Sequence, residues 1–274
     1  MSLDIGIIGC GAIAQMIIEK LNKHRIEGIR IRVLFDRNID RVDTLSKIIH
    51  NDVLKTNNIN DLYRSEVALV VECASQDAVR EYADSILTSN KDLMVLSVGA
   101  LLNKEFYEQL VETAEKHSKR IYIPSGAVAG IDVLKAAALD TIYYLKLITS
   151  KNPKNIEQTK YLDQKGIILE NVTQKTLLFS GSAKDAVFYF PKNINVAGIL
   201  SLSGLGMKET IVEIYADPSI EKNIHEIEVM GEFGKMTSKV ENVSSPLNPK
   251  TSYLAALSAV KKLIELSEIV SIGT

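Results

Sequence analysis

Two different spacings of apolar residues alternate along the first 125 residues of the chain. Short β-branched runs predict strands at 5–8, 29–35, 67–73, 93–98 and 120–123. Longer runs with apolar residues every three or four positions predict helices at 13–22, 39–48, 76–88 and 104–117. This strand and helix order is typical of a doubly wound parallel sheet that helices cover.

After residue 140 the pattern changes to strands with one polar face, mixed with short helices. We expect strands at 155–161, 176–182, 210–216, 223–229 and 233–240, and helices at 183–189 and 194–202. Strands that follow one another this closely pair antiparallel, so the fold class is α/β with a second, α+β domain built on a largely antiparallel sheet.

The chain closes with a turn-rich segment at 244–252 and an amphipathic helix at about 253–266. We expect this helix to pack against the first domain. The predicted domains are therefore a dinucleotide-binding domain at 1–125 completed by 246–274, and a catalytic and dimerisation domain at 126–245.

Composition excludes several classes of protein. The chain has 274 residues, 46% of them hydrophobic, and a net charge of -2 that gives no electrostatic case for nucleic acid. Its first residues do not resemble a signal peptide, and no apolar run reaches membrane-spanning length. We expect a cytoplasmic protein without a membrane or nucleic-acid partner. Cys10 and Cys73 end predicted strands and are interpreted as small core residues.

A glycine turn between the first strand and the first helix carries the clearest chemical signal. Gly9, Gly11 and Ala14 occupy the small positions of G-x-G-x-x-G/A. In that Rossmann motif the first N–H groups of the helix, here those of Ala12 and Ile13, face a pyrophosphate. A turn that uses glycine for packing alone is the alternative.

The residues that end the predicted strands also suit a dinucleotide, because ligands of such sheets bind at the carboxyl ends of the strands. Asp36 follows the second strand, where a carboxylate accepts the ribose hydroxyls, and Ala74 and Ser75 follow the third. Asp36 favours NAD over NADP, whereas the adjacent Arg37 offsets its repulsion of a 2′-phosphate. We predict NAD as cofactor, with NADP also accepted.

A second cluster of small residues at 124–132 lies between the predicted domains. Ser125 and Gly126 belong to it, and it is interpreted as a hinge. Its small side chains either let the backbone approach the substrate or the nicotinamide ring, or permit close helix packing only.

Histidine is the candidate acid/base. His24, His50 and His117 lie in polar surroundings and are interpreted as surface residues, whereas His225 alternates onto the covered face of its strand. There it is either a hydrogen-bonded core residue or a neutral proton acceptor. The sequence shows no metal-ligand spacing and no nucleophile elbow, so we expect no metal, and hydride transfer is the simplest chemistry.

Seven motifs together resemble L-aspartate dehydrogenase of the archaeal and Thermotoga type. They lie at 9–14, 71–75, 97–100, 125–132, 190–197, 223–225 and 248–252, in the order of that family. The resemblance implies NAD(P)-dependent oxidation of L-aspartate to iminoaspartate. The imine then hydrolyses to oxaloacetate and ammonia or passes to quinolinate synthase in NAD biosynthesis. It also implies a homodimer.

The resemblance further implies roles for single residues. His225 corresponds to the catalytic histidine, and Ala129 and Asn195 correspond to the contacts at the nicotinamide. We look for partners of the substrate carboxylates among Lys250, Thr251 and Ser252, and among the backbone N–H groups near Ser125 and Gly126.

The segment 150–174 departs from the family picture, because it is long and polar and contains several lysines, among them Lys151. We interpret it as an insertion or an extended hairpin, and a solvated loop is favoured over a role at the substrate mouth or in a subunit contact.

Two rival functions stay open at this point. One is a related Rossmann oxidoreductase of the homoserine dehydrogenase or dihydrodipicolinate reductase type. The other is a sensor that binds NAD without catalysis.

Overall fold

The computed structural model describes residues 2–24, 26, 28–191, 194–245, 247–270 and 272–273, without the side chains of 248–250. The chain divides into two compact units. The first comprises Met1–Pro124 and Ala256–Ser271, and the second comprises Ser125–Ala255 and Ile272–Thr274. The expected combination of a Rossmann-type parallel sheet with a second, largely antiparallel sheet is confirmed.

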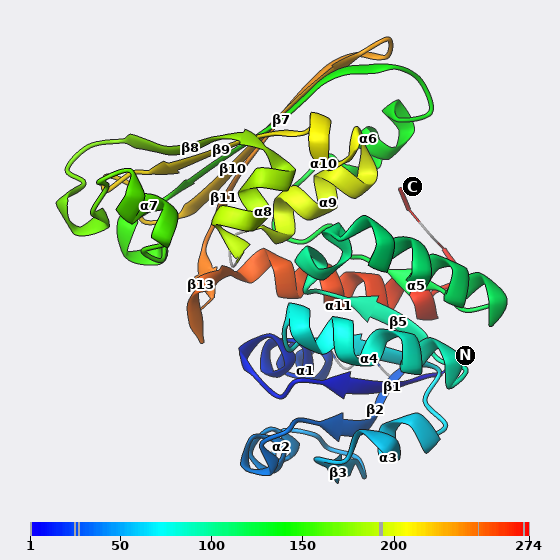
Figure 1. Ribbon diagram of the computed structural model, residues 1–274. Coiled ribbons are helices and arrows are strands. Elements are labelled where there is room, and N and C mark those ends of the chain that lie inside the picture. Colours follow the sequence, from blue (N-terminus) through cyan, green and yellow to red (C-terminus); the bar gives the residue numbers. More distant parts are fainter. Residues whose placement is uncertain are drawn as a thin grey trace. The chain divides into compact units, whose positions relative to one another are not determined.

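The first unit is built on a six-stranded sheet in the order β3-β2-β1-β4-β5-β6, with all neighbouring strands parallel (Figure 1). Every residue of β4 is buried, as expected for a central strand covered on both faces. The strands are β1 (Leu3–Ile8), β2 (Ile29–Phe35), β3 (Leu54–Thr56), β4 (Leu69–Glu72), β5 (Asp92–Val95) and β6 (Ile121–Tyr122).

Side-chain caps begin four helices of this unit, namely α2, α3, α4 and α5, whereas α1 has none. Asn38, Ser75 and Asn103 accept hydrogen bonds from backbone N–H groups of α2, α4 and α5. The helices are α1 (Ala12–Lys23), α2 (Ile39–Ser46), α3 (Ile59–Arg64), α4 (Gln76–Thr88), the 3-10 helix η1 (Val98–Leu102) and α5 (Lys104–Lys116). The final helix, α11 (Tyr253–Ser267), contributes Ala259, Val260 and Leu263 to the same buried cluster as β1 and α1.

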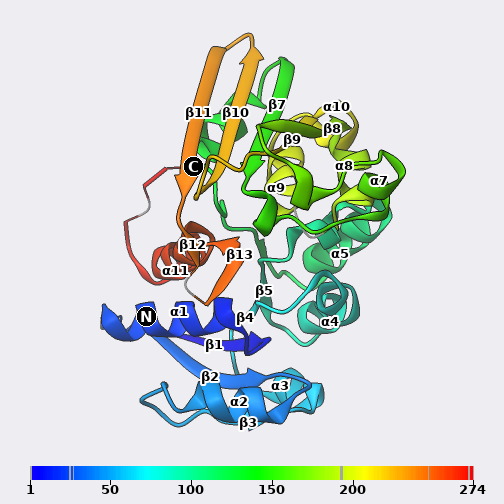
Figure 2. The ribbon, with the colours of Figure 1, turned by 90° about the vertical axis from the view of Figure 1, so that its left-hand side faces the viewer.

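The second unit is built on a five-stranded sheet in the order β11-β10-β7-β9-β8. Only β7 and β9 are parallel, and β7, β10 and β11 run side by side as its longest strands (Figure 2). Helices α6, α8 and α9 lie along one face (Figure 1). The strands are β7 (Ile142–Lys151), β8 (Thr176–Ser182), β9 (Ile211–Ala216), β10 (Asn223–Gly231) and β11 (Gly234–Asn242). The helices are α6 (Ile131–Ala137), α7 (Lys160–Gln164), α8 (Ala183–Tyr189), α9 (Asn195–Ser203) and α10 (Gly206–Glu209).

The prediction for 150–174 is wrong. In place of a strand at 155–161, the chain forms the 3-10 helix η2 (Pro153–Asn155) and then α7, which Thr159 caps. The 3-10 helix η3 (Leu169–Asn171) follows. The segment is neither a hairpin nor a solvated loop, because Ile156, Leu162 and Leu169 are buried.

Other elements were absent from the prediction. The central strand β7 is the most important of these elements. It was not recognised from the sequence because its last three residues, Thr-Ser-Lys, are polar. Short elements were missed as well, namely β3, α3 and a small hairpin of β12 (Ser244–Ser245) and β13 (Asn248–Ser252) in the turn-rich segment. Among the described residues, no helix is both long enough and apolar enough to cross a membrane.

Candidate functional site

The turn after β1 has the geometry of a phosphate-binding turn. Gly9 has φ +91°, and a Cβ there would lie 2.7 Å from Cα of Ala74. A Cβ on Gly11 would meet nothing within 4 Å. Gly11 begins α1 without a side-chain cap, and the first turn carries no acidic residue. Among the described residues, no side chain caps the N–H groups at the start of α1, so these groups suit an anion.

Asp36, directly after β2, holds this turn in place. Its Oδ2 accepts a hydrogen bond from the backbone N of Cys10 at 2.9 Å, and its Oδ1 accepts one from the backbone N of Asn38 at 2.9 Å. Each carboxylate oxygen can accept a second bond, so the half-buried Asp36 can still bind a ribose hydroxyl.

The side chain of Arg37 binds two residues of helix α4. Its guanidinium forms an ion pair with Glu81, and its Nε donates to Oη of Tyr82 at 3.2 Å. Glu81 therefore offsets the charge with which Arg37 was expected to attract a 2′-phosphate.

Glu72 is a site residue that sequence reasoning missed. It ends β4 with 1% of its surface exposed. Its carboxylate accepts hydrogen bonds from the backbone N of Ala74 at 2.8 Å and from both N and Oγ of Ser97 at 2.9 Å. Burial raises the pKa of Glu72, while the bonds from Ser97 and Ala74 lower it. A charged residue at the end of an otherwise apolar strand was the available signal.

The structure brings most of the predicted cofactor residues to one edge of the first sheet. The ends of β1, β2 and β4 are adjacent, because Ile8 pairs with Phe35 on one side and with Glu72 on the other. Gly9, Gly11, Ala12, Ile13, Asp36, Arg37, Ala74 and Ser75 all lie at these ends. An open position at Gly11, an uncapped helix and an acceptor for ribose together fit a dinucleotide.

The two predicted nicotinamide contacts lie in the second unit, and both are exposed. Ala129 precedes α6, and its carbonyl accepts a bond from Oγ of Ser238 at 3.0 Å. Asn195 is the first residue of α9.

The helix-covered face of the second sheet is apolar over most of its length and polar in two rows at one end. In one row, Thr149 of β7 stands opposite His225 of β10. In the next row, Asn223 of β10 pairs with Asn242 of β11, and the same register continues to Lys151 of β7. All five side chains are buried.

His225 is a neutral imidazole. It is 5% exposed, and its Nδ1 lies 3.0 Å from Oγ1 of Thr149. Burial, with a smaller contribution from the charge of Lys151, lowers the pKa of His225 to about 3. The imidazole is therefore unprotonated at neutral pH, and one of its ring nitrogens carries a free electron pair.

The small-residue loop at 125–130 lies beside the same end of this sheet. Nδ2 of Asn242 donates to the carbonyl of Ala127 at 2.9 Å. Gly126 and Gly130 adopt φ values of +70° and +87°, which favour glycine. The half-buried Ser125 begins the loop.

The predicted carboxylate ligands at 250–252 lie on β13, which pairs with β12 just after β11 ends. Ser252 is buried and Thr251 is half-buried, whereas the side chain of Lys250 lies outside the described part of the structure. Sequence reasoning did not identify Thr149, Asn223 or Asn242, and it placed Lys151 in a solvated loop.

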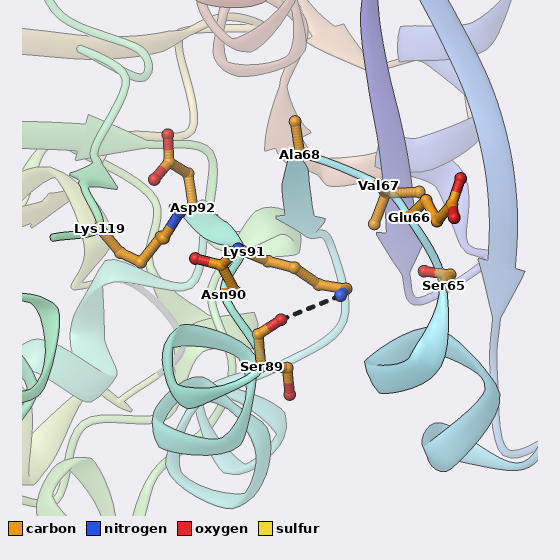
Figure 3. A pocket seen from close by; sticks show the side chains of 9 residues that line it. All are labelled: Ser65, Glu66, Val67, Ala68, Ser89, Asn90, Lys91, Asp92 and Lys119. Atoms are coloured by element: carbon orange, nitrogen blue, oxygen red, sulfur yellow. Dashed lines mark hydrogen bonds between the residues drawn. The ribbon is translucent and has the colours of Figure 1, made fainter. Parts of the chain in front are cut away.

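In the first unit, a hollow of about 410 Å³ lies at the amino-terminal ends of β4 and β5, opposite the strand ends that carry the predicted cofactor residues. The buried Lys91 extends across it (Figure 3), and its Nζ donates to the carbonyls of Tyr63 at 2.9 Å and Ser89 at 3.1 Å. These bonds give Lys91 a structural role. Within the described ranges, no three His, Cys, Asp or Glu side chains are grouped to hold a metal ion.

Comparison with known proteins identifies relatives along the whole chain. Residues 132–266 match the family model "Aspartate dehydrogenase, C-terminal", and residues 9–124 match "Homoserine dehydrogenase, NAD binding domain". L-Aspartate dehydrogenases from Methanosarcina mazei and Methanococcoides burtonii are 45% and 42% identical over 99% of this chain and 100% of their own.

Solved structures agree with this result. Aspartate dehydrogenase from Thermotoga maritima superposes with a TM-score of 0.77 and 26% identity, covering 100% of both chains. A homoserine dehydrogenase from Thiobacillus denitrificans, with a TM-score of 0.64 and 14% identity over 97% of this chain and 73% of its own, shares the fold.

Proposed function

Because the chain belongs to the L-aspartate dehydrogenase family, we propose that it oxidises L-aspartate to iminoaspartate with His225 as the proton acceptor. The chain is an NAD(P)-dependent oxidoreductase of the amino-acid dehydrogenase class. The observation that carries the role of His225 is a buried, neutral imidazole fixed by Thr149.

The first unit would hold the cofactor. The N–H groups at the start of α1 bind its pyrophosphate beside the open position of Gly11, and Asp36 accepts a ribose hydroxyl. Bound NAD or NADP supplies the acceptor for the hydride that leaves the α-carbon of the substrate. We propose a preference for NAD, because Asp36 repels a 2′-phosphate and Glu81 offsets the charge of Arg37.

His225 takes up the proton that the substrate must release. L-Aspartate enters with an ammonium group, whose nitrogen needs a free electron pair before the C=N bond can form. Neutral His225 accepts this proton at Nε2 when its Nδ1–H donates to Oγ1 of Thr149. The bond to Thr149 fixes the orientation of the imidazole.

The fate of the imine belongs to the same proposal. Hydrolysis requires a water molecule to lose a proton as it attacks the imine carbon, and His225 can accept that proton after releasing the first. The products are then oxaloacetate and ammonia. Transfer of the imine to quinolinate synthase is the second route, and it stays a prediction together with the cytoplasmic location.

A homodimer through the second unit is also proposed. Helices α6, α8 and α9 cover one face of its sheet (Figure 1), while residues of the other face are only half-buried. These include Tyr144, Lys146, Glu213, Tyr215 and Glu228. Sedimentation would show a mass of twice 30.3 kDa if the proposal holds.

NADH formation with a panel of amino acids tests the proposed activity. L-Aspartate should be turned over, and D-aspartate, L-glutamate, L-malate and L-homoserine should not. Turnover of L-homoserine in place of L-aspartate would favour the homoserine dehydrogenase alternative.

The variant His225→Ala tests the base. It should lose about two to four orders of magnitude in kcat and retain NAD affinity, whereas exposed His50→Ala should match the wild type. NAD binding without turnover of any substrate by the wild type would leave the sensor function instead.

A further inference from the structure

The polar row next to His225 contains more hydrogen-bonding capacity than the protein uses. Asn223 is 0% exposed, and neither Oδ1 nor Nδ2 of its side chain has a hydrogen-bond partner among the described residues. Oδ1 of the 3%-exposed Asn242, its partner across the strands, also lacks one there. An unpaired buried amide is costly, so its retention points to a ligand.

Lys151 gives the same row a positive charge. Lys151 is 6% exposed and lies on the same face of β7 as Thr149, two residues further along the strand. Burial lowers the pKa of Lys151 to about 8, so the ammonium form still predominates at pH 7. A buried cation and an unpaired amide, one row from a neutral imidazole, form a site for an anion.

We propose that Lys151 and Asn223 bind a carboxylate group of the substrate, with Lys151 supplying the charge and Nδ2 of Asn223 a hydrogen bond. The row lies next to His225, so the α-amino group of the same molecule can face the imidazole. The sequence predicts the carboxylate partners at 250–252 and at the backbone N–H groups near 125–126, so the site proposed here is a different one. The choice of a carboxylate rests on the proposed function, whereas an anion site does not.

Two consequences separate this role from a structural one. A side chain that merely supports the fold would lower stability when replaced, whereas replacing Asn223, whose amide has no partner among the described residues, by an apolar residue of similar shape removes a desolvation cost. A ligand anchor would lower affinity for dicarboxylates when replaced and leave the stability of the unliganded protein intact.

The variants are Lys151→Met, Lys151→Arg and Asn223→Leu, with Lys154→Met as the control. Lys154 is exposed and follows Lys151 by three positions in the chain. Each variant is first examined by thermal unfolding without ligand. We expect Asn223→Leu to unfold at or above the temperature of the wild type.

Binding is then measured by calorimetry on protein saturated with NAD. The probes are succinate, which has two carboxylates and no amino group, and butyrate, which has one. The wild type should bind succinate more tightly than butyrate. Lys151→Met and Asn223→Leu should weaken succinate binding at least about tenfold, since a hydrogen bond to a charged group is lost. Lys151→Arg should retain part of the affinity, and Lys154→Met all of it.

Steady-state kinetics provide an independent reading. In Lys151→Met the KM for L-aspartate should rise at least about tenfold with a smaller change in kcat, whereas His225→Ala should lower kcat.

Each other outcome is decisive. Unchanged succinate affinity in Lys151→Met would overturn the proposal, as would reduced stability with unchanged affinity in Asn223→Leu. Succinate bound through Lys151 without turnover of L-aspartate would retain the anion site and refute the proposed activity. Turnover of L-aspartate with no effect of Lys151→Met on KM would support the proposed activity and refute the anion site.

Discussion

Gly9 and Gly11 lie in the same turn, yet alanine at the two positions should have opposite effects. At Gly9 the backbone has φ +91°, which costs a residue with a Cβ about 1–2 kcal/mol. The new Cβ would also lie 2.7 Å from backbone and side-chain carbons of Ala74, and overpacking of this kind costs about 1–3 kcal/mol. We therefore expect Gly9→Ala to destabilise the protein by about 2–5 kcal/mol.

At Gly11 the same substitution meets no neighbour within 4 Å, and φ is -95°. Alanine is less favourable than glycine at a helix N-cap, which lowers stability. Alanine also reduces the conformational entropy of the unfolded chain, which raises stability by a similar amount. The net change should therefore stay within about 1 kcal/mol. The methyl group instead occupies the space through which the backbone approaches a pyrophosphate. We expect NAD affinity to fall at least about tenfold.

Thermal unfolding with and without NAD measures both effects. At a concentration of 100 times its Kd, NAD should stabilise the wild type by about 2.7 kcal/mol. A tenfold weaker Kd at the same concentration leaves about 1.4 kcal/mol, so the temperature shift caused by NAD should fall by about half in Gly11→Ala. A full shift in Gly11→Ala, or an unchanged unfolding temperature in Gly9→Ala, would refute this account of the turn.

Three further predictions follow from the site. Glu81→Gln removes the ion-pair partner of Arg37, so the ratio of kcat/KM for NADP to that for NAD should rise several-fold; an unchanged ratio in initial-rate assays would exclude Arg37 from recognition of the 2′-phosphate. Thr149→Val removes the partner of His225, and kcat should fall about 10- to 100-fold while NAD affinity stays the same in a binding assay. The pKa of His225 is about 3 in the folded protein and 6.5 in the unfolded chain. Between these values the unfolded chain binds one more proton than the folded protein. The wild type should therefore lose about 1.4 kcal/mol of stability per pH unit as the pH falls from 6.5 toward 3. Urea unfolding of the wild type and His225→Gln over this range should show a shallower slope in the variant.

The sequence predicted the first unit well because its signals are local. A β-branched run followed by Gly9 and Gly11 specifies strand, turn and helix within about 15 residues, and Asp36 is recognisable from its distance along the chain. The hydrogen bonds from Cys10 to Asp36 and from Ser97 to Glu72 join residues more than 20 positions apart in the sequence. Such bonds follow from the strand order, which periodicity does not reveal.

The second unit was harder to predict because its central strand ends in polar residues that pack inside. Thr149 and Lys151 resemble the start of a solvated loop, and the lysines further along strengthened that interpretation. Only the register with β10 places Lys151 in the row of Asn223 and Asn242. His225 was recognisable, because simple alternation with Ile227 and Val229 places it on the covered face.

The two polar rows also bear on why His225 is more than a core residue. A sheet face under helices is most stable when apolar, as Leu145, Leu147, Ile227 and Val229 show on the same strands. The next rows place on this face a neutral imidazole, a buried ammonium group and an amide that has no partner among the described residues. Residues retained at a cost in stability point to a function that needs them. Asn223→Leu should therefore gain stability and lose affinity for dicarboxylates, a pair of changes that packing alone would not link.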